Sequence, residues 1–287
     1  WEDEDWEDED WADGDAIVLE PIPVWGATEV TRTSGGSVTV IGEETLDAFD
    51  YDDPHSVLTQ APGLYVRQED AFGLRPNIGL RGANSDRSKK VTLMEGGILL
   101  GPAPYAAPAA YYFPLMTRMV GVEVFKGPSA INYGPNTIGG AINMVPRAVP
   151  DALTGMVDVT LGMFLTGKVH GYVGDRNDWG GFLVEAVHLA SDGFKTLESG
   201  SETGFDKTEI NLVGVINSDI SASIYHELEV RLGYSREISR ETYLGLTDAD
   251  FALDPYQRYA ASELGRMNWW RTQGQLAYSL EVGAAFD

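Results

Sequence analysis

The chain has 287 residues, enough for one large domain or two smaller ones, and its hydrophobic content of 43% is ordinary for a folded protein. A formal net charge of -24 excludes the basic surface that nucleic acids bind, so no nucleic-acid partner is expected. The absence of cysteine excludes disulfides, thiolate metal sites and a cysteine nucleophile.

The membrane signals are equally sparse. No run of about 18 apolar residues is present to form a transmembrane helix, and no cleavable signal sequence opens the chain. Three possibilities follow: a soluble protein, a processed product, or a protein that meets the membrane as a β-barrel.

The first 30 residues differ from the rest. Residues 1–15, WEDEDWEDEDWADGD, hold ten Asp or Glu side chains, and we interpret them as a disordered acidic extension, either a solvated tail or a partner site. Residues 16–27 are apolar and β-prone, but Pro21 and Pro23 remove ladder donors. This segment is therefore expected to stay extended and exposed, open to strand addition by a partner.

A small mixed α/β unit is predicted from residue 37 to about residue 150. Asp53 is placed to cap a helix whose first residue is Pro54. The expected elements are strands at 38–41, 64–66, 77–82, 90–94, 121–125 and 141–145, with helices at 43–49 and 54–60.

After residue 150 the pattern changes to period-two alternation, in which Val157 and Val159 flank Asp158. Six strands are predicted, at 154–163, 169–173, 182–189, 207–216, 227–234 and 270–280. Their lengths suit tilted strands that cross a bilayer, and short connections alternate with long polar ones at 191–206 and 237–267. We take the Asp-rich part of the second, 248–254, as a polar loop. A soluble β-sandwich would also give alternating strands.

Three motifs resolve this ambiguity: IGLRGA at 78–83, VTLMEGG at 91–97 and GVEVFKGPSAINYGPNTIGGAIN at 121–143. They resemble the plug domain of TonB-dependent outer-membrane receptors, over residues 38–150 in order. GPAPY at 101–105, ETYLGLT at 241–247 and DPYQRY at 254–259 are most similar to the ferric dicitrate receptor branch. PYAAP at 104–108 departs from that branch, in which Gln follows Pro-Tyr-Gly, so the ligand stays open.

The resemblance implies a transmembrane β-barrel with an N-terminal mixed α/β plug domain, in the bacterial outer membrane. About 137 residues follow the plug and allow about six strands, so only the N-terminal strands of the family's 22-stranded barrel are expected. The expected division is an acidic extension with a TonB-box segment at 1–30, a plug at 31–152 and barrel strands at 153–287.

The resemblance also implies partners. TonB would pair with a box centred either on Ile17-Val-Leu-Glu or on Pro21-Ile-Pro-Val-Trp25. The candidate box residues are Ile17, Val18, Leu19, Pro21, Ile22 and Val24. The cargo would be a ferric chelate, ferric citrate or another siderophore, with cobalamin as an alternative. Iron enters only as part of that chelate, and no cofactor is expected.

An anionic chelate requires Arg, amide and hydroxyl donors. The candidate ligand-binding residues are Asn84, Ser85, Arg87, Ser88, Lys89, Tyr105, Tyr111 and Tyr112. A solvated turn and ordinary plug packing would explain the same residues. Arg271, Gln273 and Gln275 share one strand face and are expected to line the lumen.

The family motifs contain Arg81, Glu123 and Lys126, which we expect to hold the plug in place through ion pairs with the barrel wall, as a plug–barrel lock. No nucleophile, base and orienting residue are found together, and the four histidines are scattered, so an enzyme is not expected. A soluble β-rich binding or adhesion module is the alternative of a different class.

Overall fold

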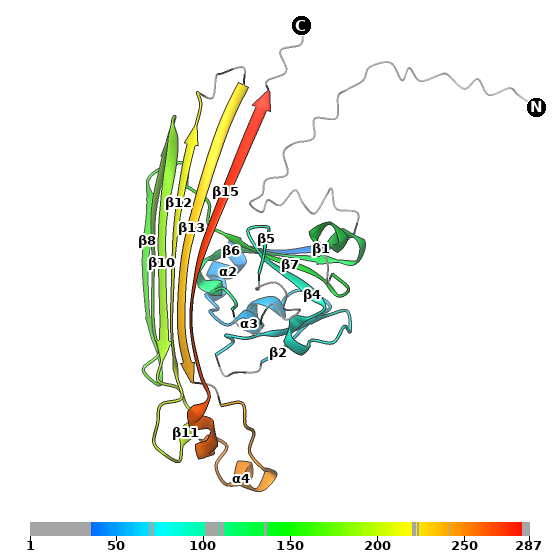
Figure 1. Cartoon of the computed structure of the whole chain (residues 1–287), viewed down its shortest axis with the longest axis vertical. Coiled ribbons are helices and arrows are strands. Elements are labelled where there is room, and N and C mark those ends of the chain that lie inside the picture. Colours follow the sequence, from blue (N-terminus) through cyan, green and yellow to red (C-terminus); the bar gives the residue numbers. More distant parts are fainter. Residues whose placement is uncertain are drawn as a thin grey trace, which may run out of the picture.

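The computed structural model describes residues 36–68, 70, 72–100, 109, 112–134, 137–219, 222, 224–240 and 242–282. The acidic extension, the candidate TonB box, Tyr105 and Tyr111 lie outside these residues. Figure 1 shows a tall curved sheet of long strands with a smaller α/β unit packed against one face. Within the described residues, no helix is long and apolar enough to cross a membrane.

A five-stranded sheet forms the centre of the α/β unit. Its order is β1-β6-β7-β4-β5, with β4 parallel to β7 and the other neighbours antiparallel. The strands are β1 (Ser37–Gly42), β6 (Met119–Lys126), β7 (Gly140–Pro146), β4 (Val91–Glu95) and β5 (Ile98–Leu99). Every residue of β4 and β7 is buried, so both faces of these strands are covered by packed structure.

Two helices and a small sheet cover the larger one. They are α2 (Glu43–Phe49), α3 (Pro54–Leu58), and β2 (Leu64–Arg67) paired with β3 (Asn77–Leu80). Three 3₁₀ turns, η1 (Asp86–Ser88), η2 (Met116–Arg118) and η3 (Gly127–Tyr133), connect the strands. Val57 and Leu58 of α3 join Ile78, Leu93 and Val124 in one buried core.

The start of α3 is as predicted, because the Asp53 carboxylate accepts a hydrogen bond of 3.0 Å from the backbone N–H of His55. Its predicted end at residue 60 is wrong. The backbone tightens into three-residue turns, with the N–H of Ala61 donating to the carbonyl of Leu58, and Pro62 disfavours a helical conformation at Ala61.

The larger sheet, here called the wall, has six antiparallel strands in the order β15-β13-β12-β10-β9-β8. They are β8 (Thr154–Leu161), β9 (Gly167–Asn177), β10 (Gly180–Ser191), β12 (Phe205–Asn217), β13 (Ile224–Arg240) and β15 (Arg266–Val282). β13 and β15 have 17 residues each and exceed the predicted lengths. The pairing of β13 with β15 continues to Arg240 and Arg266. These residues lie beyond the alternating apolar positions from which the strand lengths were predicted.

The two faces of the wall differ. Large apolar side chains such as Val184, Leu212 and Leu232 are exposed on the outer face, whereas the inner face packs against the α/β unit. Figure 1 places the long connections at one end of the wall. There β11 (Thr196–Leu197) pairs in parallel with β14 (Gln257–Arg258), beside α4 (Asp248–Leu253) and η4 (Ala260–Leu264).

The prediction of a polar loop at 248–254 is wrong, since α4 occupies it. Thr247 caps this helix, and its hydroxyl accepts a hydrogen bond of 3.2 Å from the backbone N–H of Asp250. Asp248 and Asp250 lie in the first turn, where negative charge favours a helix. A capped helix thus forms without the apolar periodicity that sequence reasoning looks for.

Candidate functional site

A belt of charged side chains lines the inner face of the wall where the α/β unit packs against it. Five of these wall side chains are at most 2% exposed: Lys168, Glu185, Lys207, Glu209 and Glu237. Charged groups are almost never buried to this extent unless they are paired. Each of the five has a partner in the α/β unit, and some also pair with other wall residues.

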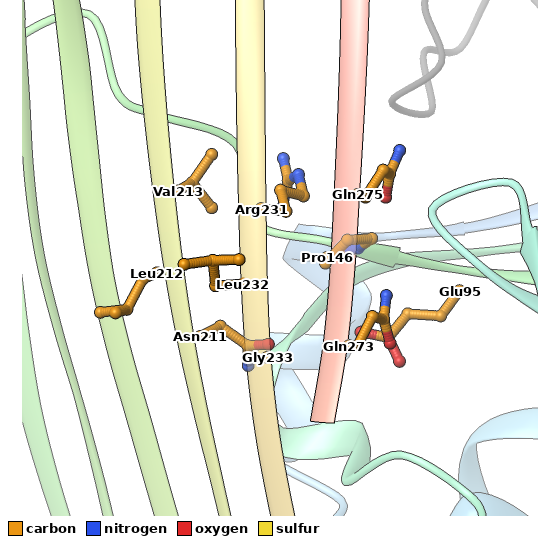
Figure 2. Close-up of a pocket in the computed structure, with 10 residues that line it drawn as sticks. All are labelled: Glu95, Pro146, Asn211, Leu212, Val213, Arg231, Leu232, Gly233, Gln273 and Gln275. Atoms are coloured by element: carbon orange, nitrogen blue, oxygen red, sulfur yellow. The ribbon is translucent and has the colours of Figure 1, made fainter. Parts of the chain in front are cut away.

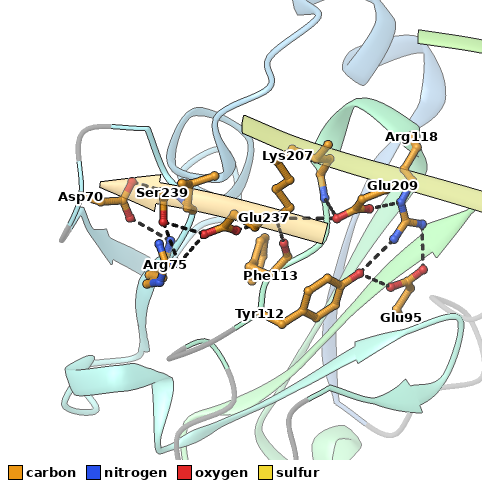
Figure 3. A network of polar contacts seen from close by, with 12 residues as sticks. Asp70, Arg75, Glu95, Tyr112, Phe113, Arg118, Lys207, Glu209, Glu237 and Ser239 are labelled. Carbon is orange, nitrogen blue, oxygen red and sulfur yellow. Dashed lines mark hydrogen bonds and ion pairs between the residues drawn. The ribbon is translucent and has the colours of Figure 1, made fainter. Parts of the chain in front are cut away.

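Arg118, at the end of η2, connects the α/β unit to the wall (Figure 3). Its Nη1 lies 2.7 Å from Oε1 of Glu95 on β4, and its Nε donates to Oε2 of Glu209 on β12. The Tyr112 hydroxyl lies 3.3 Å from both Arg118 Nη2 and Glu95 Oε2, and Glu209 also accepts from the N–H of Leu115 at 3.2 Å. One guanidinium therefore bridges two carboxylates from different sheets.

The electrostatics favour the charged forms of this cluster. Burial alone would raise the pKa of Glu95, but the Arg118 guanidinium outweighs it and the pKa falls below its ordinary value. Burial opposes the charge on Arg118, yet Glu95 and Glu209 raise the Arg118 pKa well above its ordinary value. Burial, with Glu209 and Glu95, raises the pKa of Tyr112 well above its ordinary value, so Tyr112 stays protonated.

A second cluster lies beside the first, and Lys207 joins them (Figure 3). Arg75 of the α/β unit donates to Glu237 and, at 3.2 Å, to the Ser239 hydroxyl of β13. Lys207 Nζ lies 3.6 Å from a carboxylate oxygen of both Glu209 and Glu237. It also donates to the backbone carbonyl of Phe113 in the α/β unit.

A third group of contacts ties α2 and its following loop to the wall. Lys168 of β9 lies 2.8 Å from Asp50 and 3.3 Å from Asp52. Arg147, just after β7, lies 2.8 Å from Glu43 of α2 and 3.7 Å from Glu185 of wall strand β10. The α/β unit is therefore held to the wall at three places by ion pairs.

A small pocket lies in the seam between the two parts (Figure 2). Its lining combines residues of both: Glu95, Pro146, Asn211, Leu212, Val213, Arg231, Leu232, Gly233, Gln273 and Gln275. Arg271 lies next to it, with its guanidinium 4.2 Å from the Tyr112 ring centroid. The prediction that Arg271, Gln273 and Gln275 share an inward face is confirmed.

The chemistry of this seam is binding chemistry. It offers amides, guanidinium groups and carboxylates, and these can form and release hydrogen bonds and ion pairs. Among the described residues, no three His, Cys, Asp or Glu side chains are grouped to hold a metal ion.

The residues of the predicted ligand loop, 84–89, differ in how far they are exposed. Ser88 is fully buried, and its hydroxyl donates to the Pro76 carbonyl and accepts from the Ile78 N–H, each at 2.9 Å. Ser88 is therefore removed as a ligand residue, because its polar atom is committed to the backbone. Asn84 and Lys89 remain exposed, with Lys89 in an ion pair of 2.8 Å with Asp86.

Ser85 and Arg87 of this loop are partly buried. Arg87 has a positive φ of 52°, and its backbone N–H donates to the Asn77 side chain at 2.8 Å. Tyr112 was expected to face a ligand, but it is only 5% exposed and packs edge-on against Trp269 of β15. That expectation is corrected: Tyr112 belongs to the seam with the wall.

The residues of the predicted plug–barrel lock form no ion pair with the described strands of the wall. Lys126 donates to the Thr39 hydroxyl at 2.6 Å and to the Pro62 carbonyl at 3.2 Å, while Glu123 accepts from the Asn143 amide at 2.9 Å. All of these partners lie in the α/β unit. Arg81 is exposed beside Gly127, at the end of the central sheet opposite the wall contacts. The ion pairs to the described wall come from other residues.

Sequence reasoning missed Arg75, Arg118, Glu209 and Glu237. A signal existed, since Lys207, Glu209 and Glu237 are charges on the inward-facing side of alternating strands. A hydrated lumen predicts the same pattern, so the sequence did not distinguish pairing from hydration.

Comparisons with known proteins agree with this geometry. Residues 30–141 match the family model of the TonB-dependent receptor plug domain. The vitamin B12 transporter BtuB of Photobacterium profundum is 24% identical over 237 residues, which cover 80% of this chain and 36% of that protein. The iron-regulated outer membrane virulence protein of Vibrio cholerae is 25% identical over 231 residues, 77% of this chain and 34% of that protein.

A solved structure, the unliganded ferric citrate transporter FecA, superposes with a TM-score of 0.68 at 22% identity, covering 87% of this chain and 38% of that one. This likeness shows the shared fold. The chain thus spans about a third of the length of the curated relatives that it matches.

The wall has an apolar outer face, and the ion-paired α/β unit covers its inner face. This is the arrangement of an outer-membrane β-barrel wall with a plug domain packed inside it. The chain carries the plug domain of a TonB-dependent receptor, followed by strands of that family's barrel, and it is an outer-membrane protein. The α/β unit is hereafter called the plug. The prediction of a TonB-dependent receptor is confirmed.

Proposed function

We propose that this chain is the N-terminal part of a receptor that imports an anionic ferric chelate, with TonB supplying the energy. The observation that supports it is the seam: the buried ion pairs Arg118–Glu209 and Arg75–Glu237 join the plug to the wall, and such pairs hold the plug at rest and can be separated by force. Well-packed apolar contacts would often hold such a seam equally well or better, because burying charge is costly.

The proposed transport needs no bond chemistry, and we infer that the protein is not an enzyme. Ligand binding biases the plug toward a state that TonB engages. TonB adds a strand to the box at residues 17–25 and pulls. The division into an extension and box at 1–30, a plug at 31–152 and barrel strands at 153–287 belongs to this proposal.

The ligand residues that remain in the proposal are Asn84, Ser85, Arg87 and Lys89, together with Tyr105 and Tyr111. Amide, hydroxyl and cationic donors suit a citrate or catecholate complex, whose charge is negative. The name of the relative FecA, a ferric citrate transporter, supports ferric citrate as the first ligand to test.

Import of cobalamin is the second candidate, because one relative is a vitamin B12 transporter. The test is uptake by cells that carry the receptor containing this chain as their sole TonB-dependent importer. Radiolabelled ferric citrate, ferric catecholates and cobalamin are supplied in turn, with and without TonB. Uptake of a ferric chelate only with TonB supports the proposal, uptake of cobalamin alone would replace it with the second candidate, and uptake of none would refute both.

A further inference from the structure

An open pocket of about 320 Å³ lies on the outer face of the wall, beside the turn that joins β9 to β10. This turn is a short connection, so the pocket lies at the end of the wall opposite the long loops (Figure 1). Short turns of outer-membrane strands face the periplasm, which puts the pocket at the level of the periplasmic leaflet. It is called the hairpin pocket, and its lining residues are Asp175, Asn177, Trp179, Gly180, Gly181 and Phe182.

The backbone of this turn is held in place from two strands. The N–H of Trp179 donates to the Asn177 side chain at 2.9 Å, and the backbone N–H of Asn217 on β12 donates to the Trp179 carbonyl at 3.1 Å. The Asn217 amide also donates to the Asp178 carbonyl at 2.7 Å. Trp179 nevertheless remains 68% exposed. The ring is therefore presented from a fixed backbone, which reduces the entropy cost of binding.

The hairpin pocket adjoins the apolar band of the outer face. Phe182 is exposed, and Val173 and Val184, which are direct register partners, are the next exposed side chains along the same face. Because side chains alternate along a strand, these three lie on the outer side, whereas Leu183 packs in the core with the plug residue Val149. An exposed Trp at the end of such a band is typical of the boundary between hydrocarbon and headgroups.

One carboxylate interrupts this apolar surface. Asp175 is half-buried and lies directly opposite Phe182 in the register. Its Oδ1 accepts a hydrogen bond of 2.9 Å from the N–H of Arg176, and its Oδ2 has no hydrogen-bond or ion-pair partner among the described residues. The Arg176 guanidinium pairs at 2.6 Å with Glu227 on the inner face, and none of the described residues that line the pocket is basic. A carboxylate at the edge of the hydrocarbon is costly without a cation, so the pocket is suited to a cation from outside the chain.

We propose that the hairpin pocket binds the primary ammonium group of a zwitterionic phospholipid in the periplasmic leaflet, with Asp175 as the acceptor and the Trp179 ring against the ammonium. A carboxylate forms charge-assisted hydrogen bonds with an ammonium group, and the face of a tryptophan ring attracts cations. The acyl chains lie along Val173 and Val184. A headgroup that carries phosphate without an ammonium is repelled by Asp175. The pocket lies on the opposite face of the wall from the plug seam, so this binding is independent of the proposed transport.

The test measures retention of a defined lipid by the purified receptor that contains this chain, in neutral detergent, by native mass spectrometry. The lipids are phosphatidylethanolamine, phosphatidylcholine and phosphatidylglycerol with identical acyl chains, and free ethanolamine is the competitor. The variants are Asp175→Asn and Trp179→Leu. Asp178→Asn is the matched control, since Asp178 is an exposed residue of the same turn that does not line the pocket. Electrophoretic mobility before and after heating verifies that each variant barrel is folded.

The wild type and the Asp178→Asn control are expected to retain phosphatidylethanolamine about tenfold more strongly than phosphatidylglycerol, because only the former supplies an ammonium. Phosphatidylcholine is expected to bind more weakly than phosphatidylethanolamine, since its quaternary ammonium has no N–H to donate. Asp175→Asn is expected to weaken retention of phosphatidylethanolamine about tenfold, and Trp179→Leu about threefold. Equal retention of the ethanolamine and glycerol lipids by the wild type, unchanged retention by Asp175→Asn, or displacement of the lipid by an equal concentration of free ethanolamine would each overturn the proposal.

Discussion

The guanidinium of Arg118 in the plug is ion-paired with the carboxylate of Glu209 in wall strand β12, and the two side chains are only 2% and 1% exposed. The residues lie 91 positions apart in the chain. Because neither charge has access to bulk water, each depends on the other for its solvation.

Replacing Glu209 by Gln is expected to destabilise the docked plug by about 3–5 kcal/mol, because it leaves the Arg118 charge buried with one partner removed. Protease sensitivity of the plug in the inserted receptor measures this. Glu198→Gln, on an exposed loop residue, is the control and is expected to change nothing. The joint change Arg118→Met with Glu95→Leu and Glu209→Leu, which removes the whole charged triad, is expected to recover stability, and failure of Glu209→Gln to loosen the plug would contradict the assigned role.

The pH dependence of plug stability is expected to carry a contribution from Glu95. Burial opposes ionisation of this carboxyl, but Arg118 lowers its pKa below the ordinary 4.5. A lowered pKa in the folded state stabilises the fold above about pH 4.5, and the contribution is lost as the pH falls through the folded value. Denaturant unfolding of the plug between about pH 3 and pH 6 tests this. Glu95→Gln is expected to flatten the curve, and an unchanged slope would disprove the assignment.

Glu123 is expected to act with the opposite sign. Burial raises its pKa above 4.5, although the hydrogen bond from Asn143 partly offsets this. The fold therefore favours the protonated acid, and this contribution is lost as the pH rises through the folded value. Glu123→Gln keeps an acceptor for Asn143 without the charge, so the free energy of unfolding at neutral pH is expected to rise. A fall at neutral pH and no change at low pH would contradict this.

Substitutions at two neighbouring residues of the predicted ligand loop are expected to have different effects, one on plug stability and the other on ligand affinity. Ser88→Ala leaves the Ile78 N–H without its acceptor and is expected to cost about 1–3 kcal/mol of plug stability with ligand affinity preserved. Lys89→Gln removes an exposed charge and is expected to weaken affinity for an anionic chelate with stability preserved. Calorimetric titration with ferric citrate and denaturant unfolding of both variants test the pair, and a reversal would exclude Lys89.

A cross-link between β1 and β6 is expected to block transport under the proposed mechanism. Thr39 and Val124 are register partners, and β1 is the edge strand that follows the proposed TonB box. The sequence has no cysteine, so Thr39→Cys with Val124→Cys introduces a single possible pair. Oxidation is expected to abolish chelate uptake and reductant to restore it, with each single-cysteine variant as a control. Undiminished uptake by the oxidised double variant would show that β1 need not separate from β6.

The sequence by itself determined the two-part architecture, because the signals involved are local. Alternation around Asp158 and Leu228 predicts two-faced strands, Asp53 before Pro54 predicts a capped helix, and the motif at 121–143 predicts a plug. The apolar-periodicity signal fails for α4, because the cap at Thr247 starts this helix without such periodicity.

Only the tertiary structure decided which charges meet. Strand alternation places Glu209 and Glu237 on the inner face, but it does not specify whether water or a plug arginine lies opposite. That choice depends on how two sheets dock across about a hundred residues of chain, and Arg118 and Arg75 meet the wall only after docking. The same docking buries Tyr112, while the fold of the plug buries Ser88, and both residues thereby lose the exposure that a ligand-binding role needs.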